Sequence, residues 1–412
     1  MFTKILLFML MALSVMVHSL NVPFDLLNWA SVTQNGSPVT AGIPLPQGAV
    51  TDLSKLRITD ASGNTVPAQF RALNRWWWEK NKLGTSQPSL KWVLCDFQPS
   101  TVTAKSVLSG YTLRDDFSGS TPTTQLNLTD ASDKITVSTG PLKFTVNKLH
   151  FNLFDELWLD ANSNSTFESN EQIITSNMQN GGTIIAGDWV AGECVNGTIH
   201  RSSESAPRFV TIEEQGPMKV VIKIEGNHYA PSNGVKMGLY GYQCFITAYS
   251  GKAFVDVQWL VTNYTIVGVP AAVKYSYISW PFSKYTLNLG LNISATQYAI
   301  LGDSTEFAGA IGASDSIKLI QKRSSFTLSN TAGGKLAQGG AMLTNGQLGI
   351  SVACRDFAPN NPKGITLTNN NLALELFPDT GLSKYWIDPN ARKNHRMRFE
   401  FFKGNYIAGN LS

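Results

Sequence analysis

The feature that most constrains the fold is an alternation of apolar and polar residues with a period of two, repeated along most of the chain. In MKVVIKIE, residues Met218, Val220, Ile222 and Ile224 face one way and Lys219, Lys223 and Glu225 face the other, as on a strand with one buried face. The segments FVDVQWLVT, KFTVN, LKWVLCDF, LGISVAC and LALELF read in the same way, and turn-forming clusters such as ASGN and NNPKG separate such segments. The sequence therefore predicts an all-β, mainly antiparallel protein.

The N-terminus has the pattern of a cleaved signal peptide. Lys4 precedes an unbroken apolar run at 5–17, and small residues follow at Val17 and Ser19. A membrane-spanning helix needs about 20 apolar residues, so the run is too short for an anchor. We expect residues 1–19 to be removed, the mature protein to be secreted or held in a secretory organelle, and no membrane span to remain.

Acceptor motifs for N-linked glycans are consistent with that compartment. We expect glycosylation at Asn127, Asn164, Asn196, Asn263 and Asn292. Further motifs stand at Asn35 and Asn410. The alternative is that a chain rich in Asn, Ser and Thr contains such motifs by chance.

Charge excludes one class of partner. Charged residues make up 15% of the chain and the net charge is +4, without a basic stripe. Nucleic acid binding is therefore not expected. The most basic stretch, ARKNHRMR at 391–398, is expected to be a solvated hairpin.

The four cysteines leave two interpretations open. Cys95, Cys194, Cys244 and Cys354 could form two disulfides in three connectivities. Alternatively, those in apolar strand-like segments are buried free thiols. No CxxC motif occurs, so structural zinc is not expected.

The stretch DANSNSTFESNE at 160–171 has nearly the spacing of a calcium-binding loop. Oxygen ligands would come from positions 1, 3, 5, 7, 9 and 12, which are Asp160, Asn162, Asn164, Thr166, Glu168 and Glu171. Position 6 is Ser165, where Gly normally allows the sharp turn, and strand-like segments flank the loop. The loop is thus either a weak calcium site or a polar hairpin tip with a glycan on Asn164.

Several longer stretches resemble one protein family. GIPLPQG, PAQF and SLKWVLCDFQ, in this order, resemble the N-terminal RIFT-type β-barrel of exo-acting rhamnogalacturonan lyases and YetA-like proteins, polysaccharide lyase family 26. EEQGPMKVVIKIEGNH, FITAYSGKAFVDVQWLVTN, CRDFAPNNPKGITL and NARKNHRMRFEFF resemble the central β-sandwich of that family.

The resemblance implies a small RIFT-type β-barrel at 20–115, a large antiparallel β-sandwich at 116–405 and a tail at 406–412. A Ser-, Thr- and Gly-rich stretch at 110–124 is the best place for the domain boundary. In the family a helical toroid follows this point, whereas this sequence stops at Ser412, so either the protein lacks the toroid or the sequence is an incomplete one.

The family relation also suggests a chemistry. A lyase of this class would cleave an acidic glycan by β-elimination, which needs a base, a cation for the carboxylate, and an acid for the leaving oxygen. The candidates are Arg355, Asp356 and His395, with weaker support for Lys384 and Tyr385. His395 is followed by Arg396, where the family has Glu. The alternatives are a structural ion pair for Arg355 and Asp356 and an exposed turn for His395.

The stretch RWWW predicts a carbohydrate contact. On a strand, Trp76 and Trp78 would share one face, and aromatic faces stack on sugar rings while arginines bind carboxylates. The candidate substrate-binding residues are Arg71, Arg75, Trp76, Trp78 and Trp92. Packing of the three adjacent rings between domains is the alternative.

These observations predict a secreted, carbohydrate-related protein of the rhamnogalacturonan-lyase-like family. Without the toroid, glycan binding or a structural role is the favoured function. The alternative is a polysaccharide lyase acting on rhamnogalacturonan or another acidic glycan. The expected partner is a pectic or other acidic polysaccharide, and calcium is the only cofactor suggested.

Overall fold

The computed structural model describes residues 19–79, 87–119, 124–190, 193–231, 238–263, 281–329, 332–381 and 385–409; side chains at 187–196 and 332 are outside this description. The chain divides into two compact units, Met1–Thr123 and Thr124–Ser412. The signal-peptide prediction at 1–19 falls almost entirely outside the described residues. None of the helices in the described part is long and apolar enough to cross a membrane.

Unit 1 is built from two sheets. One has the order β1-β7-β3-β4 and the other β2-β6-β5. The strands are β1 (Asn21–Asn28), β2 (Val39–Pro44), β3 (Arg57–Thr59), β4 (Thr65–Val66), β5 (Ala68–Arg75), β6 (Leu90–Phe97) and β7 (Ser106–Arg114), and a 3-10 turn, η1, spans Leu53–Lys55. Ile58, Val93, Cys95 and Leu113 are fully buried in the core of this unit.

The pairings of the described residues in unit 1 do not close these sheets into a barrel. β1 pairs only with β7 and β2 only with β6, so both are edge strands. Pro23 in β1 lacks an N–H donor and suits such an edge position. The all-β prediction is confirmed, whereas barrel closure is not observed.

Unit 2 begins with a five-stranded sheet of order β12-β11-β10-β9-β8. Its strands are β8 (Asn127–Asp130), β9 (Lys134–Ser138), β10 (Leu142–Asn147), β11 (Glu156–Leu159) and β12 (Gln172–Ile174). A 3-10 turn, η2 (Ser169–Glu171), leads into β12.

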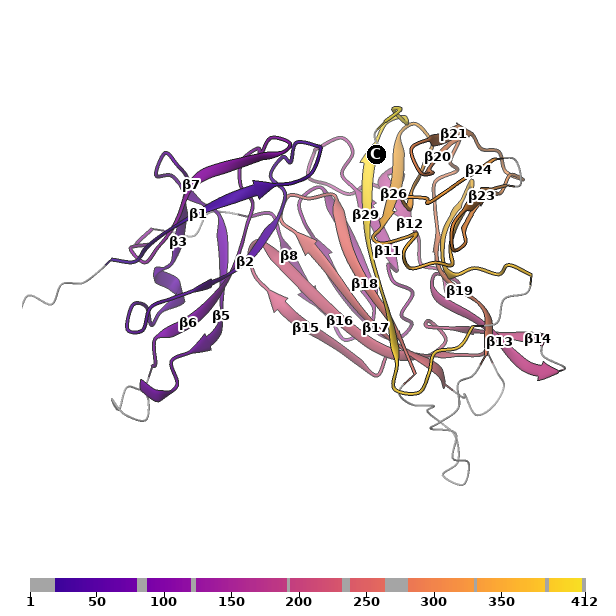
Figure 1. The fold of residues 1–412 in the computed structure, drawn as a ribbon, viewed down its shortest axis with the longest axis horizontal. Coiled ribbons are helices and arrows are strands. Elements are labelled where there is room, and N and C mark those ends of the chain that lie inside the picture. Colours follow the sequence, from indigo (N-terminus) through magenta and orange to yellow (C-terminus); the bar gives the residue numbers. More distant parts are fainter. Residues whose placement is uncertain are drawn as a thin grey trace, which may run out of the picture. The chain divides into compact units, whose positions relative to one another are not determined.

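The remaining described strands of unit 2 form a 17-stranded sheet (Figure 1). They are β13 (Gly181–Val190), β14 (Glu193–Arg201), β15 (Phe209–Gln215), β16 (Lys219–Tyr229), β17 (Gly238–Tyr249), β18 (Phe254–Thr262), β19 (Phe282–Gly290), β20 (Gln297–Leu301), β21 (Glu306–Ala310), β22 (Ile317–Gln321), β23 (Phe326–Leu328), β24 (Ala332–Gly334), β25 (Gly340–Thr344), β26 (Leu348–Cys354), β27 (Lys363–Thr368), β28 (Asn371–Phe377) and β29 (Arg392–Lys403).

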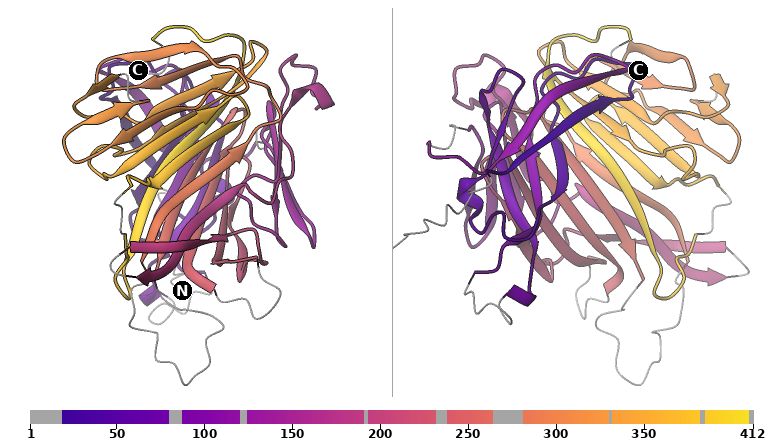
Figure 2. Two further views of the ribbon diagram at one scale, coloured as in Figure 1. Left: turned by 90° about the vertical axis from the view of Figure 1, so that its right-hand side faces the viewer. Right: turned by 60° about the vertical axis from the view of Figure 1, so that its left-hand side comes forward.

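This sheet consists of two runs of paired strands. One run is β15-β16-β17-β18-β29-β26-β25-β20-β21, and the other is β14-β13-β19-β28-β27-β22-β23-β24. The pairing of Arg201 with Tyr229 links them. Figure 2 shows the C-terminal strands of the first run side by side from two further directions.

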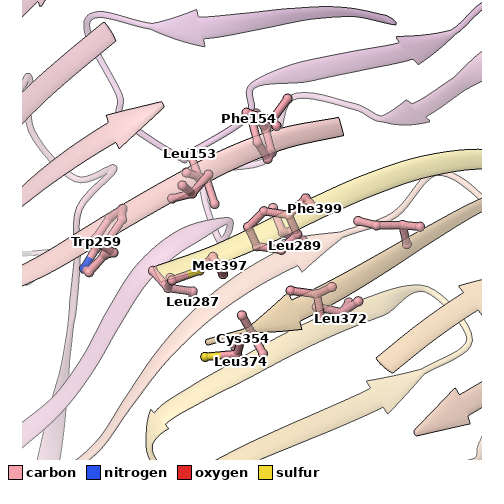
Figure 3. Packing of buried hydrophobic residues seen from close by; sticks show 14 of the residues in the cluster. Leu153, Phe154, Trp259, Leu287, Leu289, Cys354, Leu372, Leu374, Met397 and Phe399 are labelled. Atoms are coloured by element: carbon pink, nitrogen blue, oxygen red, sulfur yellow. The ribbon is translucent and has the colours of Figure 1, made fainter. Parts of the chain in front are cut away.

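Apolar side chains of the two runs meet in one core, which confirms the β-sandwich (Figure 3). Leu287 and Leu374 of one run pack near Met397 and Cys354 of the other. Phe154 lies edge-on to the Phe399 ring, with 5.9 Å between ring centroids. Each large side chain buried in this way contributes about 1.5–3 kcal/mol.

The basic stretch at 391–398 is not a solvated hairpin, so that prediction is wrong. Most of it belongs to β29, which pairs with both β18 and β26. Arg396 and Arg398 face solvent, whereas His395 and Met397 are buried. The same two-residue alternation that identifies the other strands places one face of this stretch in the core.

Candidate functional site

A polar pocket of about 380 Å³ lies in unit 2, where the loop after β12 meets the end of β19 and the turn between β27 and β28. Its lining consists of Thr175, Asn177, Gln179, Asn180, Asn288, Gly290, Leu291, Asn370 and Asn371. Six of these nine residues are Asn or Gln, so we call it the amide pocket.

Main-chain hydrogen bonds fix the walls of the amide pocket. The Asn180 N–H donates to the Asn177 carbonyl at 3.1 Å, which closes the loop at 175–180 into a turn. The Leu291 N–H donates to the Asn370 carbonyl at 2.7 Å, which joins the end of β19 to the β27–β28 turn. The pocket is therefore formed by segments far apart in sequence.

Asn180 is the most deeply buried polar residue of the lining, with 1% of its surface exposed. Its Oδ1 accepts the Gly290 N–H at 2.7 Å, whereas its Nδ2 is buried without a hydrogen-bond partner. A Cβ on Gly290 would lie 3.0 Å from Asn180 Oδ1 and 3.3 Å from Asn177 Nδ2. Glycine at 290 thus keeps space open between the two amides.

A second layer of polar contacts holds the loop from behind. Asn152, also 1% exposed, donates through Nδ2 to Asp155 at 2.7 Å and to the Asn177 carbonyl at 3.3 Å. The Ser176 hydroxyl donates to the same Asp155 oxygen at 2.6 Å. These bonds orient the 175–180 loop before any ligand arrives.

The chemistry of the amide pocket is neutral hydrogen bonding. Each side-chain amide carries two donors and a two-lone-pair acceptor. No Lys, Arg, His, Asp or Glu is among the described residues that line the pocket. The arrangement suits a ligand rich in hydroxyl groups rather than proton transfer or metal binding. Sequence reasoning missed it, although the NNN run at 369–371 and the repeated amides at 177–180 are visible signals.

The three predicted catalytic residues differ in their exposure to solvent. Arg355 and Asp356 follow β26, are well exposed, and face each other at 3.7 Å. His395 of β29 is 2% exposed, and neither ring nitrogen has a hydrogen-bond partner. The structure thus puts two of the three side chains in solvent and the third in the core. Lys384 lies outside the described residues, and the Tyr385 hydroxyl donates to the Pro378 carbonyl at 2.8 Å.

A buried lysine that sequence reasoning did not single out lies in the same region as His395. Lys363 is 1% exposed and donates to the Leu376 carbonyl at 2.8 Å. Burial lowers the pKa of Lys363 to about 7. Burial, with smaller contributions from the positive charges of Lys363 and Lys393, holds the pKa of His395 well below its usual range. Within NNPKG, Lys363 looks like a turn residue, which concealed its burial.

The RWWW stretch does not continue the strand, so the predicted alternation of Trp76 and Trp78 on one face is wrong. β5 ends at Arg75 after two irregularities in its pairing with β6, and Trp78 already has helical backbone. Trp77 is the exposed ring, at 71%.

The other predicted sugar-binding residues of unit 1 have varied surroundings. Arg75 donates to the carbonyls of Thr51 and Pro88, at 3.0 and 2.7 Å. Lys91 lies 4.8 Å from the centroid of the Trp76 ring. Arg71 and Trp92 are exposed on β5 and β6. Their role in sugar binding stays a prediction.

The 160–171 loop folds as a self-bonded turn between β11 and β12. Asp160 accepts the N–H groups of Asn164 and Ser165 at 3.0 and 2.9 Å. Ser165 has a φ of 64°, the left-handed conformation that glycine would adopt at this position. Glu171, 3% exposed, accepts the N–H groups of Ala161, Asn162 and Glu168.

The remaining side chains of that loop also bond within it. Asn164 Nδ2 donates to Glu168 at 2.7 Å, and Asn162 Nδ2 donates to the other Glu168 oxygen at 3.2 Å. The Thr166 hydroxyl donates at 3.0 Å to the Glu168 oxygen that also accepts from Asn164. The hydrogen bond from Asn164 is the first cause that lowers the pKa of Glu168 to about 2. No group of three or more His, Cys, Asp or Glu in the described part of the chain is arranged to hold a metal ion. Calcium binding stays a prediction.

Among the predicted glycan acceptors, Asn127 and Asn292 are exposed. Asn263 Nδ2 donates to the Ile387 carbonyl at 2.7 Å. The Asn164 amide is engaged as described above, and the side chains of Asn196 and Asn410 lie outside the described residues. Glycosylation of these sites stays a prediction.

The cysteines with described side chains are free thiols. Cys95, Cys244 and Cys354 are buried and form no disulfide, which confirms the buried-thiol interpretation for these three. Burial raises the pKa of Cys95 to about 12 and that of Cys354 to about 11. The side chain of Cys194 is outside the described residues.

Two solved structures share the fold of this chain. A protein in glycosyl hydrolase family 38 from Enterococcus faecalis matches with a TM-score of 0.55 and 11% identity, over 93% of this chain and 44% of that chain. An alpha-mannosidase from Enterococcus faecalis V583 gives 0.55 and 12%, over 93% and 43%. This chain spans less than half the length of either, and at such identity the likeness shows the fold alone.

The sequence comparison is more specific. No curated protein matches the chain. The family described as PcRGLX-like protein central beta sandwich domain matches residues 126–262, which include all strands from β8 to β18. The match agrees with the resemblance noted for EEQGPMKVVIKIEGNH. Residues 126–262 of this chain therefore correspond to the central β-sandwich domain of PcRGLX-like proteins.

Proposed function

We propose that this protein is a secreted glycan-binding protein whose amide pocket holds sugar hydroxyl groups. The observation that carries the proposal is the pocket itself: six amide side chains on preformed walls, with the buried Asn180 Nδ2 left unpaired. Sugar hydroxyls both donate and accept hydrogen bonds, so they can match both ends of an amide. The PcRGLX-like domain and the glycosyl hydrolase fold relatives support a carbohydrate ligand.

Binding to immobilised plant and microbial polysaccharides, followed by titration calorimetry with the oligosaccharides that bind, tests this proposal. We expect Asn371→Ala and Gly290→Ala to weaken binding, the first by removing an amide and the second by filling the space beside Asn180. Asn394→Ala removes an exposed amide from β29, outside the pocket, and is the matched control. Binding that survives both pocket variants, or absence of binding to every glycan, would reject the proposal.

Lyase activity is a second candidate, favoured by one observation. Lys363, whose pKa burial lowers to about 7, is a group of the kind that accepts a proton near neutral pH. We expect an active lyase to release product with unsaturated-uronate absorbance from rhamnogalacturonan, and Lys363→Met, His395→Ala and Arg355→Ala to reduce the rate. Wild-type protein that releases no such product would remove this candidate.

A further inference from the structure

We infer that the amide pocket selects uncharged sugar residues over uronic acids. The inference rests on the proposed function, and it concerns which glycans the same pocket takes. The family resemblance led to the expectation of an acidic glycan, so the pocket points to a different class of ligand.

A carboxylate ligand would lack a cation partner in the described lining of the amide pocket. Recognition of a carboxylate is strongest when Arg or Lys supplies charge-assisted hydrogen bonds. The described lining of the amide pocket contains neither. A carboxylate that leaves water for such a site loses hydration without gaining an opposite charge, which is costly.

The lining leaves both hydrogen-bond donors and a hydrogen-bond acceptor available to a ligand. Asn177 and Asn370 use their Oδ1 atoms to accept from Gln179 N–H at 2.8 Å and Thr368 hydroxyl at 3.1 Å. These two side chains therefore offer their NH₂ donors. Asn288 does the opposite: it donates Nδ2 to the Thr183 hydroxyl at 3.3 Å, so its carbonyl oxygen is the group left over.

The pocket thus presents donors and an acceptor together. A hydroxyl group can accept from one amide and donate to another, whereas an ionised carboxylate can only accept. A carboxylate placed beside the Asn288 carbonyl oxygen would meet a second acceptor and leave that oxygen unsatisfied. An acceptor that is covered by a ligand without receiving a hydrogen bond weakens binding.

An acidic side chain, Asp155, lies behind the wall of the pocket. Asn152 joins the Asn177 carbonyl to Asp155, and Ser176 donates to the same Asp155. An acidic side chain is therefore one hydrogen-bonded residue away from the pocket wall. A neutral sugar is insensitive to this charge, whereas a uronate would be repelled by it.

A matched pair of ligands tests the inference. α-1,4-Linked galactotetraose and α-1,4-linked tetragalacturonic acid differ at each sugar only in whether carbon 6 is a hydroxymethyl group or a carboxylate. Titration calorimetry of the full chain should show the neutral tetrasaccharide binding at least about tenfold more tightly. Equal or tighter binding of the acid would overturn the inference while leaving glycan binding intact. If neither of these ligands nor any other oligosaccharide binds, the proposed function is rejected, and this inference is rejected with it.

A gain-of-function variant locates the selection. Asn371→Lys adds a cation to the pocket lining, so we expect it to raise affinity for the acidic tetrasaccharide about tenfold. Asn394→Lys adds the same charge on β29, outside the pocket, and should leave that affinity nearly unchanged. Equal gains from both variants, or no gain from Asn371→Lys in a folded protein, would contradict selection at the pocket.

Discussion

Two polar loops flank the short strand β12, and they use their side chains in opposite ways. The loop at 160–171 directs its carboxylates and amides onto its own backbone and its own neighbours. The loop at 175–180 is instead fixed mainly by other segments, through Asn152, Asp155 and Gly290. It leaves amides to line a pocket. A concentration of Asn and Ser therefore does not by itself identify a binding site; what matters is where the hydrogen-bonding partners come from.

The largest expected effect separates the loops by stability. Glu171→Ala removes a buried carboxylate that accepts three backbone N–H groups. We expect the free energy of unfolding to fall by about 3 kcal/mol, because hydrogen bonds to a charged group are strong and the freed donors remain poorly hydrated. Urea denaturation measures the change. A loss below about 1 kcal/mol would mean that the loop is not held from within.

The next effect separates the loops by function. Asn180→Ala removes one partner of the Gly290 N–H and should cost about 1–2 kcal/mol of stability. Glycan affinity should fall at least about tenfold, or about 1.4 kcal/mol, whereas Glu168→Gln in the other loop should leave it unchanged. Calorimetry on both folded variants gives the comparison. Loss of binding in Glu168→Gln alone would reverse the roles assigned to the loops.

A smaller effect concerns calcium. If the 160–171 loop is a weak site of the extracellular kind, with a Kd of about 10⁻⁴–10⁻³ M, calcium at about 1 mM should add about 0.4–1.4 kcal/mol of stability. We expect the melting temperature to rise with calcium, Asp160→Asn to diminish that rise, and Asn180→Ala to retain it. A glycan at full occupancy on Asn164, with no calcium-dependent shift, would identify the loop as a glycosylated turn.

The smallest effect is the response to acid. The pKa of Glu168 is lowered to about 2, so its stabilising hydrogen bonds are fully present above its ordinary value of 4.5. They are lost as the pH falls from there towards about 2. The stability difference between wild type and Glu168→Gln should shrink across that window in denaturation curves.

The pocket has no titratable side chain in its described lining, so glycan affinity should be constant from about pH 5 to pH 8. A titration of affinity within that range would show that a group outside the lining controls binding.

The sequence by itself determined the class of fold and much of the core. The alternation in β16 and β18 correctly identified the buried Val220, Ile222 and Val257. It would also have placed His395 on the buried face of β29 with Met397 and Phe399, had the basic stretch been treated as a strand. A local period is enough for these assignments because successive side chains on a strand point to opposite faces.

Only the tertiary structure decided which strands pair and what their ends bring together. β19 pairs with β13 and β28, so Gly290 meets Asn180 and Asn371 across long sequence separations. The tertiary structure also decided that Lys363 is buried, which its turn-like NNPKG motif conceals. It decided as well that the two sheets of unit 1 do not pair with each other within the described residues. The physical reason is that alternation specifies which face of a strand is buried but not its neighbour, and the amide pocket exists only where those neighbours end.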